Sequence, residues 1–130
     1  MIALDTNAVV WLGENPERLS RAAVRAIESA VESGEGLMVS SASFYEIALG
    51  IQRGRIETSA TIEELLAAIE RRFMVAPMTA EIATAAAQLP TEFPRDPFDR
   101  IIAATAMAHR APLVTADEQI RKSRVLRVIW

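Results

Sequence analysis

Four short apolar runs, set between longer segments with helical periodicity, constrain the fold of this chain more than any other feature of its sequence. The runs cover residues 2–4, 37–39, 73–75 and 113–115. Each is too short to be a buried helix and ends near polar or turn-forming residues, which is typical of strands in a parallel sheet covered on both faces. Residues 125–129 are predicted to form a last strand.

The segments between the runs carry helix start and stop signals. Ser20 is a favourable N-cap for a helix whose apolar stripe contains Val24, Ile27 and Val31, and Gly34 is a suitable stop. A short helix is expected over residues 8–12, and a longer one from Ser41 or Ser43 to near Gly54. A capping box at Thr61 starts the next helix, and an alanine-rich helix covers residues 79–89 and ends before Pro90. The last of these helices starts at Asp96, with Pro97 at its first position.

This alternation of strands and helices predicts an α/β fold in which helices cover both faces of a parallel sheet, an α/β/α sandwich. The chain has 130 residues, of which 51% are hydrophobic. Residues 1–130 are therefore expected to form one domain with a core of its own.

Composition excludes several classes of site. The chain has no cysteine, which excludes disulfides, zinc–thiolate sites, iron–sulfur clusters and cysteine nucleophiles. Asp5 interrupts the first apolar run too early for a signal peptide, and no apolar stretch approaches the roughly 18 residues that a membrane span needs. We expect a cytoplasmic protein without membrane contact.

The net charge of −3 does not favour a nucleic-acid-binding protein. Lys122 is, however, the only lysine among 14 basic residues, and arginine suits bidentate phosphate contacts better than lysine does. An acidic catalytic centre would itself lower the net charge. The charge therefore argues mildly against a nucleic-acid partner and does not exclude one.

Acidic residues stand where the strands are expected to end. Asp5 directly follows the first run, and Asp117 comes two residues after the fourth. Glu46 is expected in the first turn of the helix that leaves the second strand, while Asp96 and Asp99 open the helix that precedes the fourth. In a parallel sheet these positions lie at the carboxyl edge, where ligands bind. Carboxylates from four separate segments are thus predicted to meet at one edge.

Such a cluster needs a cation or bound protons. Two like unit charges about 4 Å apart repel by about 4 kcal/mol at an effective dielectric constant near 20. Mg²⁺ and Mn²⁺ prefer carboxylate and water oxygens, and such a site suits phosphodiester hydrolysis by an activated water. No side-chain nucleophile is required and none is well placed, since the single histidine, His109, is expected at a helix end.

The acids lie in ordered motifs that resemble those of a known family. Leu-Asp-Thr-Asn at residues 4–7, Glu46 in Ser-Phe-Tyr-Glu-Ile, Asp-Pro-Phe-Asp-Arg at residues 96–100 and Leu-Val-Thr-Ala-Asp at residues 113–117 are similar to the motifs of PIN-domain ribonucleases. Among these, the chain most resembles the VapC-type toxins of bacterial toxin–antitoxin pairs. The motifs extend from residue 4 to residue 117, so the resemblance covers nearly the whole chain.

The resemblance implies a Mg²⁺-dependent endoribonuclease, with Mn²⁺ able to substitute, that cuts RNA and so inhibits translation and growth. It also implies a homodimer and a cognate antitoxin protein that blocks the site, with a larger hetero-oligomer as a further expectation. By motif match, Asp5 and Asp99 are the principal metal ligands, Glu46 completes the site, and Asp117 is a fourth acid that acts directly or through water. The supporting residues of the motifs are Thr6, Asn7, Asp96, Arg100 and Thr115, of which Thr115 would hold the site by hydrogen bonding.

Each acid also has a purely structural explanation. Asp5, Asp96 and Asp117 would each cap the helix that follows, because aspartate is a preferred N-cap. Glu46 has a serine three residues before it and would complete a capping box. Asp99 would gain about 0.3–1 kcal/mol from the helix dipole. Taken together, these explanations do not account for the convergence of all the acids on one edge.

Other side chains have ordinary interpretations as well. Arg100 is expected to be a solvated or salt-bridged helix residue, with a phosphate contact as the alternative. Trp11, Phe44 and Tyr45 are expected in the core or in a dimer interface rather than as stacking platforms, because aromatic residues make up only 5% of the chain.

Three alternative functions are weighed against the ribonuclease. A phosphoaspartyl phosphatase needs a second acid two residues after Asp5, where this chain has Asn7. A Mg²⁺-dependent receiver domain needs an aspartate at the end of its middle strand, and the third apolar run leads instead into Ala76 and Pro77. A catalytically silent interaction module with the same fold is the third alternative, and the four intact acids argue against it.

Overall fold

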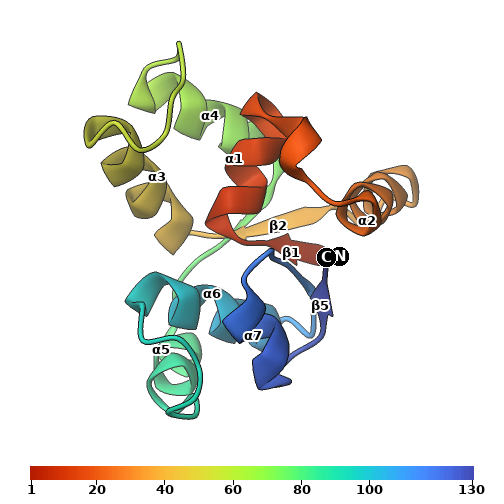
Figure 1. The fold of residues 1–130 in the computed structure, drawn as a ribbon, viewed down its shortest axis with the longest axis vertical. Helices are drawn as coiled ribbons and strands as arrows, with labels where there is room; N and C mark the ends of the chain where they lie inside the picture. The colour runs from red at the N-terminus through yellow and green to blue at the C-terminus, as the bar shows by residue number, and fades with distance from the viewer.

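A five-stranded sheet, with every strand parallel to its neighbours, runs through the centre of the molecule (Figure 1). The computed structural model describes all residues from 1 to 130. The order of the strands across the sheet is β3-β2-β1-β4-β5. The strands are β1 (Ile2–Leu4), β2 (Leu37–Ser40), β3 (Met74–Ala76), β4 (Leu113–Val114) and β5 (Val128–Ile129).

Seven α-helices and one short 3-10 helix connect the strands. They are α1 (Thr6–Glu14), the 3-10 helix η1 (Pro16–Arg18), α2 (Arg21–Glu32), α3 (Ala42–Gln52), α4 (Ile62–Arg72), α5 (Ala80–Ala87), α6 (Pro97–Ala108) and α7 (Glu118–Ser123). Three predicted helix starts are confirmed, because the hydroxyls of Ser20, Thr61 and Thr79 each accept a hydrogen bond from the backbone N–H three residues later. Gly34 follows α2 with φ of +79°, a conformation that glycine adopts readily.

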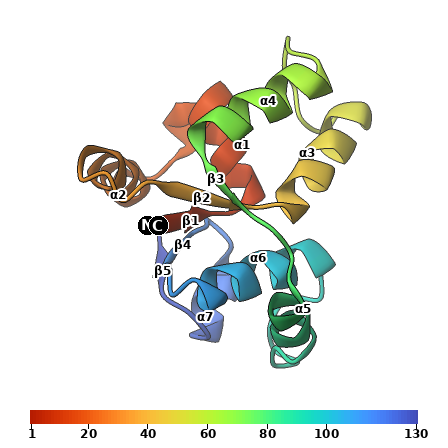
Figure 2. The same ribbon diagram turned by 180° about the vertical axis from the view of Figure 1, so that it is seen from behind.

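Two apolar layers sandwich the sheet. On one face, Leu4 and Val39 pack with residues of α1, α2, α3 and α4. On the other face, Ala3, Met38 and Leu113 pack with residues of α6 and α7. Figures 1 and 2 show α1 and α4 on one side of the sheet and α5, α6 and α7 on the other. The predicted α/β/α sandwich is confirmed.

Several predicted boundaries are wrong by a few residues. The first helix begins at Thr6, two residues earlier than expected, because Asp5 is its N-cap. Strand β3 begins one residue later, because the buried Phe73 forms the C-cap of α4. The predicted last strand over residues 125–129 is paired only over Val128–Ile129. Val31, placed in the apolar stripe of α2, is 55% exposed, since the helix buries Ala23, Ile27 and Ala30 instead.

The strand order reverses between β1 and β4, and we call the space outside the carboxyl ends of these two strands the crevice. From β1 the chain moves outward to β2 and β3, then returns to the other side of β1 to form β4 and β5. Ligands of open parallel sheets bind outside the carboxyl ends of the strands where the order reverses in this way. Asp5 and Thr115 directly follow β1 and β4, so they stand at this position. None of the helices combines the length and apolar character needed to cross a membrane.

Candidate active site

Thr115 joins two of the predicted acids at the crevice. Its buried hydroxyl accepts a hydrogen bond from the backbone N–H of Asp117 over 3.1 Å, and its interaction with the Asp5 carboxylate lowers the pKa of that acid. Asp5 also caps α1 through Ala8 N (2.8 Å), and Asp117 caps α7 through Ile120 N (3.0 Å). The expected capping roles are therefore present, and they fix both carboxylates at the carboxyl edge of the sheet.

Glu46 reaches the crevice from α3. It is the fifth residue of that helix and lies in its second turn, so the prediction of the first turn is wrong. The Thr6 hydroxyl donates a hydrogen bond to Glu46 Oε1 and also pairs with the buried Ser43 hydroxyl (2.9 Å). Because Ser43 lies inside the helix and bonds to Thr6, it forms no capping box with Glu46.

The cap of α3 also differs from the prediction. Ser41 occupies the N-cap position, but its side chain makes no capping hydrogen bond and instead accepts one from Met78 N (3.2 Å). The hydroxyl of Ser40, at the end of β2, accepts from Ala42 N (3.2 Å). The first turn of α3 is therefore held by the strand that precedes it.

Asp96 and Asp99 open α6 on the far side of the crevice. Asp96 Oδ1 caps the helix by accepting from Phe98 N (2.8 Å) and Asp99 N (3.2 Å). The half-buried Asp99 carboxylate accepts no hydrogen bond in the structure. Asp96 thus caps the helix, whereas the only structural gain open to Asp99 is that of an acid in the first turn of α6.

The pKa values reveal how closely the acids interact. Burial, followed by repulsion from Asp96, Asp117, Glu46 and Asp5, raises the pKa of Asp99 to about 7. Burial is also the largest cause that raises the pKa of Asp5 to about 6, against the lowering effect of its hydrogen bonds. Burial and repulsion from Asp96 raise the pKa of Glu46 above its ordinary value. The structure therefore brings the five predicted carboxylates within electrostatic range of one another.

This donor set is chemically suited to a hard divalent cation. It consists of carboxylate oxygens, the ligands that Mg²⁺ and Mn²⁺ prefer, and a cation would relieve the repulsion that raises the pKa values. No group of three or more acidic or histidine side chains is spaced closely enough to hold a metal ion as it stands. The carboxylates thus form a loose cluster whose oxygens would have to draw together around a cation.

Two arginines that the sequence did not single out line a pocket beside the acids. The pocket has a volume of ≈ 350 Å³, and its walls include Glu46, Asp96, Phe98, Arg53 and Arg55. Arg55 lowers the pKa of Glu46, so the guanidinium lies near that carboxylate. Both arginines are exposed and form no salt bridge. The exposed Asn7 lines this pocket and the neighbouring groove of ≈ 500 Å³.

Glycines position these two arginines. Gly54 has φ of +70°, which turns the chain back after α3, and the N–H groups of Arg55 and Ile56 donate to Gly50 O over 2.8 and 3.0 Å. A Cβ on Gly50 would lie 2.5 Å from Ile56 Cδ1, so this close approach requires glycine. The Arg-Gly-Arg sequence after a helix was the available signal for this feature.

Arg100 has a role that neither sequence interpretation anticipated. Its guanidinium donates to five backbone carbonyls, those of Ala86, Leu89, Pro90, Phe93 and Pro94, over 2.9–3.4 Å. It forms no salt bridge and is only partly exposed, and its donors are already engaged. Arg100 fastens the segment between α5 and α6 against the start of α6.

The aromatic residues divide between core and surface. Trp11 packs against Trp130 with ring centroids 5.9 Å apart and lies under the Arg18 guanidinium. Phe44 is half-buried against the core. Tyr45 is 62% exposed, so it lies outside the core, and a dimer interface stays a prediction for it. Its ring lies 6.1 Å from that of Phe98.

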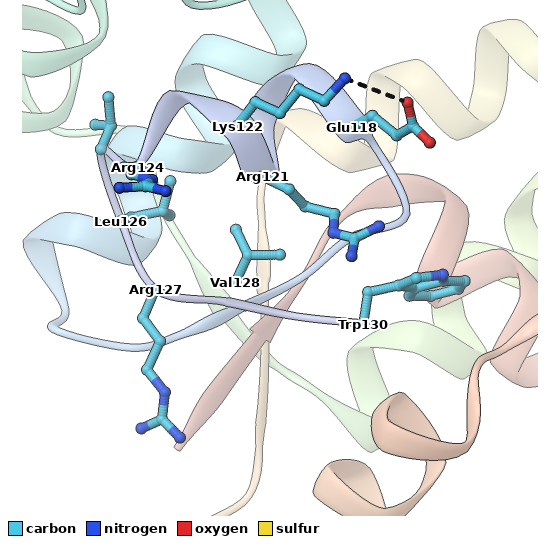
Figure 3. Close-up of a pocket in the computed structure, with 9 residues that line it drawn as sticks. Glu118, Arg121, Lys122, Arg124, Leu126, Arg127, Val128 and Trp130 are labelled. Atoms are coloured by element: carbon cyan, nitrogen blue, oxygen red, sulfur yellow. Dashed lines mark ion pairs between the residues drawn. The ribbon is translucent and has the colours of Figure 1, made fainter.

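The largest concave surface lies along the edge of the sheet, away from Glu46 and Asp99. This α7–β5 groove has a volume of ≈ 910 Å³ and is lined by Glu118, Arg121, Lys122, Arg124, Val125, Leu126, Arg127, Val128 and Trp130 (Figure 3). Lys122 pairs with Glu118 over 3.8 Å. Arg121 projects from α7 toward Trp130.

Comparison with known proteins identifies the family. The sequence profile of the PIN domain matches residues 2–125. This chain belongs to the PIN domain family. It is 36% identical to ribonuclease VapC22 of Mycobacterium tuberculosis over 131 residues, which cover 99% of this chain and 98% of that protein. The predicted family resemblance is confirmed.

Solved structures share the fold of this PIN domain. The VapBC2 complex of Rickettsia felis bound to a promoter DNA fragment contains a chain with a TM-score of 0.72 and 20% identity, covering 98% of this chain and 97% of that one. The DNA-bound VapBC of Salmonella typhimurium matches with a TM-score of 0.70 and 23% identity, and the match covers 98% of this chain and 97% of that one. The alternative of a receiver domain is wrong, because receiver sheets have the order 2-1-3-4-5.

Proposed function

We propose that this chain is a metal-dependent endoribonuclease whose catalytic centre is the carboxylate cluster of Asp5, Glu46, Asp99 and Asp117. The observation that carries the proposal is the convergence of these acids, from four separate segments, on the crevice where the strand order reverses. Helix capping explains the positions of Asp5 and Asp117 but not those of Glu46 and Asp99. Similarity to a ribonuclease over nearly the full length supports the same assignment.

Mg²⁺ is the proposed cofactor, and Mn²⁺ would substitute for it. The carboxylate oxygens of Asp5, Glu46 and Asp99 would hold the cation. Asp117 would bind it directly or through a water molecule. When bound, such a cation supplies an activated water and stabilises charge on the phosphoryl oxygens. Asp99 is the carboxylate most available to a cation, because it accepts no hydrogen bond and because burial, followed by repulsion from the other acids, raises its pKa.

The neighbouring residues position the acids and the substrate. Thr115 orients Asp5 and Asp117 from the end of β4, and Thr6 orients Glu46 from α1. Arg53 and Arg55 would bind the phosphates of RNA in the pocket beside Glu46, because an exposed, unpaired guanidinium matches phosphate geometry. Asn7, on the wall shared by that pocket and the next groove, is placed to contact the same strand.

Cleavage of RNA by the purified protein tests the proposal. A mixed pool of cellular RNA is incubated with the protein in Mg²⁺, in Mn²⁺ or in EDTA, and the new 5′ ends are mapped. We expect internal cuts with either metal and none in EDTA. An intact pool in all three conditions, from a sample with cooperative unfolding and no bound inhibitor, would refute the endoribonuclease. Cuts that persist in EDTA would refute the metal dependence.

We also propose that the chain is the toxin of a toxin–antitoxin pair in the cytoplasm, where it inhibits translation and growth. The fold it shares with chains of VapBC complexes supports a protein antitoxin as partner, and a homodimer that joins a larger hetero-oligomer with the antitoxin is the proposed assembly. Expression of the chain alone should arrest growth, and co-expression of the open reading frame next to its gene should restore it. Normal growth with active protein present would contradict the toxin role.

A further inference from the structure

We propose that the α7–β5 groove binds the phosphate backbone of single-stranded RNA, as an exosite beside the carboxylate cluster. The inference rests on the proposed ribonuclease function and adds a second contact surface for the same substrate. It assigns a role to residues outside all of the sequence motifs, namely Arg121, Lys122, Arg124 and Arg127.

Charge is the first observation that carries this proposal. Four cationic side chains and one acidic side chain, that of Glu118, line the groove together with the terminal carboxylate of Trp130, in a chain whose net charge is −3. Only Lys122 forms an ion pair, and its separation from Glu118 is a long 3.8 Å between exposed groups. The guanidinium groups of Arg121, Arg124 and Arg127 form no salt bridge. Positive potential concentrated in a concave surface is the electrostatic signature of a nucleic-acid site.

The position of the groove is the second observation. Its α7 wall begins immediately after Asp117, which caps that helix. At the same end, Thr115 N donates to Ile129 O (3.3 Å), so Trp130 lies next to the carboxyl edge that holds the acids. At the other end, Leu113 N donates to Arg127 O (2.9 Å). A strand bound in the groove would thus leave the crevice and follow the sheet edge along β5 for about 7 Å, at roughly 3.3 Å for each of its two residues.

The lining offers the contacts that single strands use. Strand β5 is the last strand of the sheet, so one side of its backbone has no partner strand. Ile129 faces β4, which leaves the N–H of Val128 on the open side, where it could donate to phosphate. Trp130 contributes a half-buried indole to the lining (Figure 3). The bond between Thr115 N and Ile129 O places this residue at the carboxyl end of the sheet. Positive grooves with an aromatic side chain are the common means of binding single strands without sequence preference.

Simpler explanations account for only part of the groove. A charged residue beside an edge strand discourages strand pairing between molecules, which would explain Arg127, directly before β5. Cations in the last turn of a helix are favoured by its dipole, which would explain Arg121 and Lys122. Neither explains why cations from the helix and from the segment between α7 and β5 line one concave surface.

RNA binding without cleavage provides the test. Fluorescence anisotropy measures the affinity of fluorescein-labelled oligouridine for the Asp99→Asn protein in EDTA, across a series of salt concentrations. The test variant adds Arg121→Ala, Arg124→Ala and Arg127→Ala. The control adds Arg21→Ala, Arg25→Ala and Arg71→Ala, exposed arginines on α2 and α4 that give the same change of net charge. A third variant replaces the three groove arginines by lysine, and thermal melts verify that each variant is folded.

We expect the alanine groove variant to bind RNA about tenfold or more weakly. The slope of the logarithm of the binding constant against the logarithm of the salt concentration should become less steep by about 2, since each phosphate contact of a single strand contributes about 0.7 and three arginines are removed. The control should bind as the parent does, and the lysine variant should keep most of the slope. An affinity and slope equal to those of the control would overturn the proposal and leave the groove for a protein partner.

The cleavage assay separates this inference from the function on which it rests. If the unmodified protein cuts RNA and the groove variant binds as the control does, only the exosite is refuted. If the groove variant loses binding while the unmodified protein never cuts RNA in any metal, only the ribonuclease is refuted. In an active protein, the alanine groove variant should raise KM and leave kcat unchanged, because the groove lies away from the reacting atoms.

Discussion

The hydroxyl of Thr6 donates a hydrogen bond to the carboxylate of Glu46, which joins the first turn of α1 to the second turn of α3. Thr6 directly follows Asp5, so one side chain couples the position of Glu46 to that of the acid at the end of β1. The buried Ser43 hydroxyl holds Thr6 in place from the other side. Two acids that are distant in the sequence therefore share one support.

Replacing Thr6 by valine should weaken that support. Thr6→Val keeps the shape of the side chain but removes the hydrogen bond that lowers the pKa of Glu46, so this pKa should rise further. Loss of an outer-shell hydrogen bond typically costs about 10–100-fold in metal affinity or activity, and we expect a higher Mg²⁺ requirement for cleavage. Thr84→Val, which loses only an exposed bond to Ala80 O, is the control. Equal Mg²⁺ titrations for both variants would exclude a role for Thr6.

Thr115→Val should disturb two acids at once. The variant removes the hydroxyl that lowers the pKa of Asp5 and leaves Asp117 N without its acceptor, which should lower the unfolding free energy by about 1–3 kcal/mol. The Mg²⁺ titration of cleavage should shift to higher concentration. Thr105→Val is the matched control, because that buried hydroxyl bonds only to Ile101 O within α6. A Thr115→Val protein with the melting temperature and Mg²⁺ titration of the control would contradict this account.

The stability of the metal-free protein should fall as the pH rises. The folded-state pKa of Asp5 is about 6 and that of Asp99 about 7, both above the ordinary 3.8. Between these values the folded protein holds protons that the unfolded chain has released. The stabilisation is therefore complete below about pH 4 and is lost as the pH passes through about 6 and 7.

Asp5→Asn tests this pH dependence. Asparagine caps a helix as well as aspartate does and carries no charge. In EDTA at pH 8 the variant should gain up to about 3 kcal/mol of unfolding free energy over the parent, and at pH 3 it should gain nothing. Chemical denaturation at the two pH values measures both numbers. A gain that does not depend on pH would show that the buried charge is not its source.

Arg100→Lys should destabilise the protein although the charge is kept. The guanidinium donates to five carbonyls, and an ammonium group has only three donors and cannot match that geometry. We expect a loss of at least about 2 kcal/mol, since buried acceptors left without donors cost about 1–3 kcal/mol each. The exposed neighbour Arg95, changed to lysine, should lose nothing measurable in the same denaturant titration.

Local signals predicted the frame of the fold and the position of the acids. The cap of α2 by Ser20 and the four short apolar runs depend on neighbours in the sequence, so pattern and spacing were sufficient. Asp5 directly follows one predicted strand, and Asp117 comes two residues after another. These positions were sufficient to predict both acids at the carboxyl edge of the sheet. The ordered motifs then selected the same acids that the structure brings within electrostatic range.

Features that depend on tertiary contact were out of reach. The carbonyls that Arg100 binds belong to a loop whose course the sequence pattern does not define. Arg53 and Arg55 reach the pocket only because Ile56 folds back onto Gly50. The helical turn that carries Glu46 was misplaced because the start of α3 is held by a strand residue rather than by its own cap.

The most direct test of the central claim compares two aspartates in the same turn of α6. Asp96→Asn and Asp99→Asn make the same chemical change three residues apart, and asparagine at position 96 keeps the helix cap. Cleavage of labelled RNA is measured for both variants in Mg²⁺, with thermal melts to verify folding. We predict that Asp99→Asn abolishes cleavage and that Asp96→Asn retains most of it. A folded Asp99→Asn protein that cuts RNA as fast as the unmodified chain would contradict a catalytic centre built on these carboxylates.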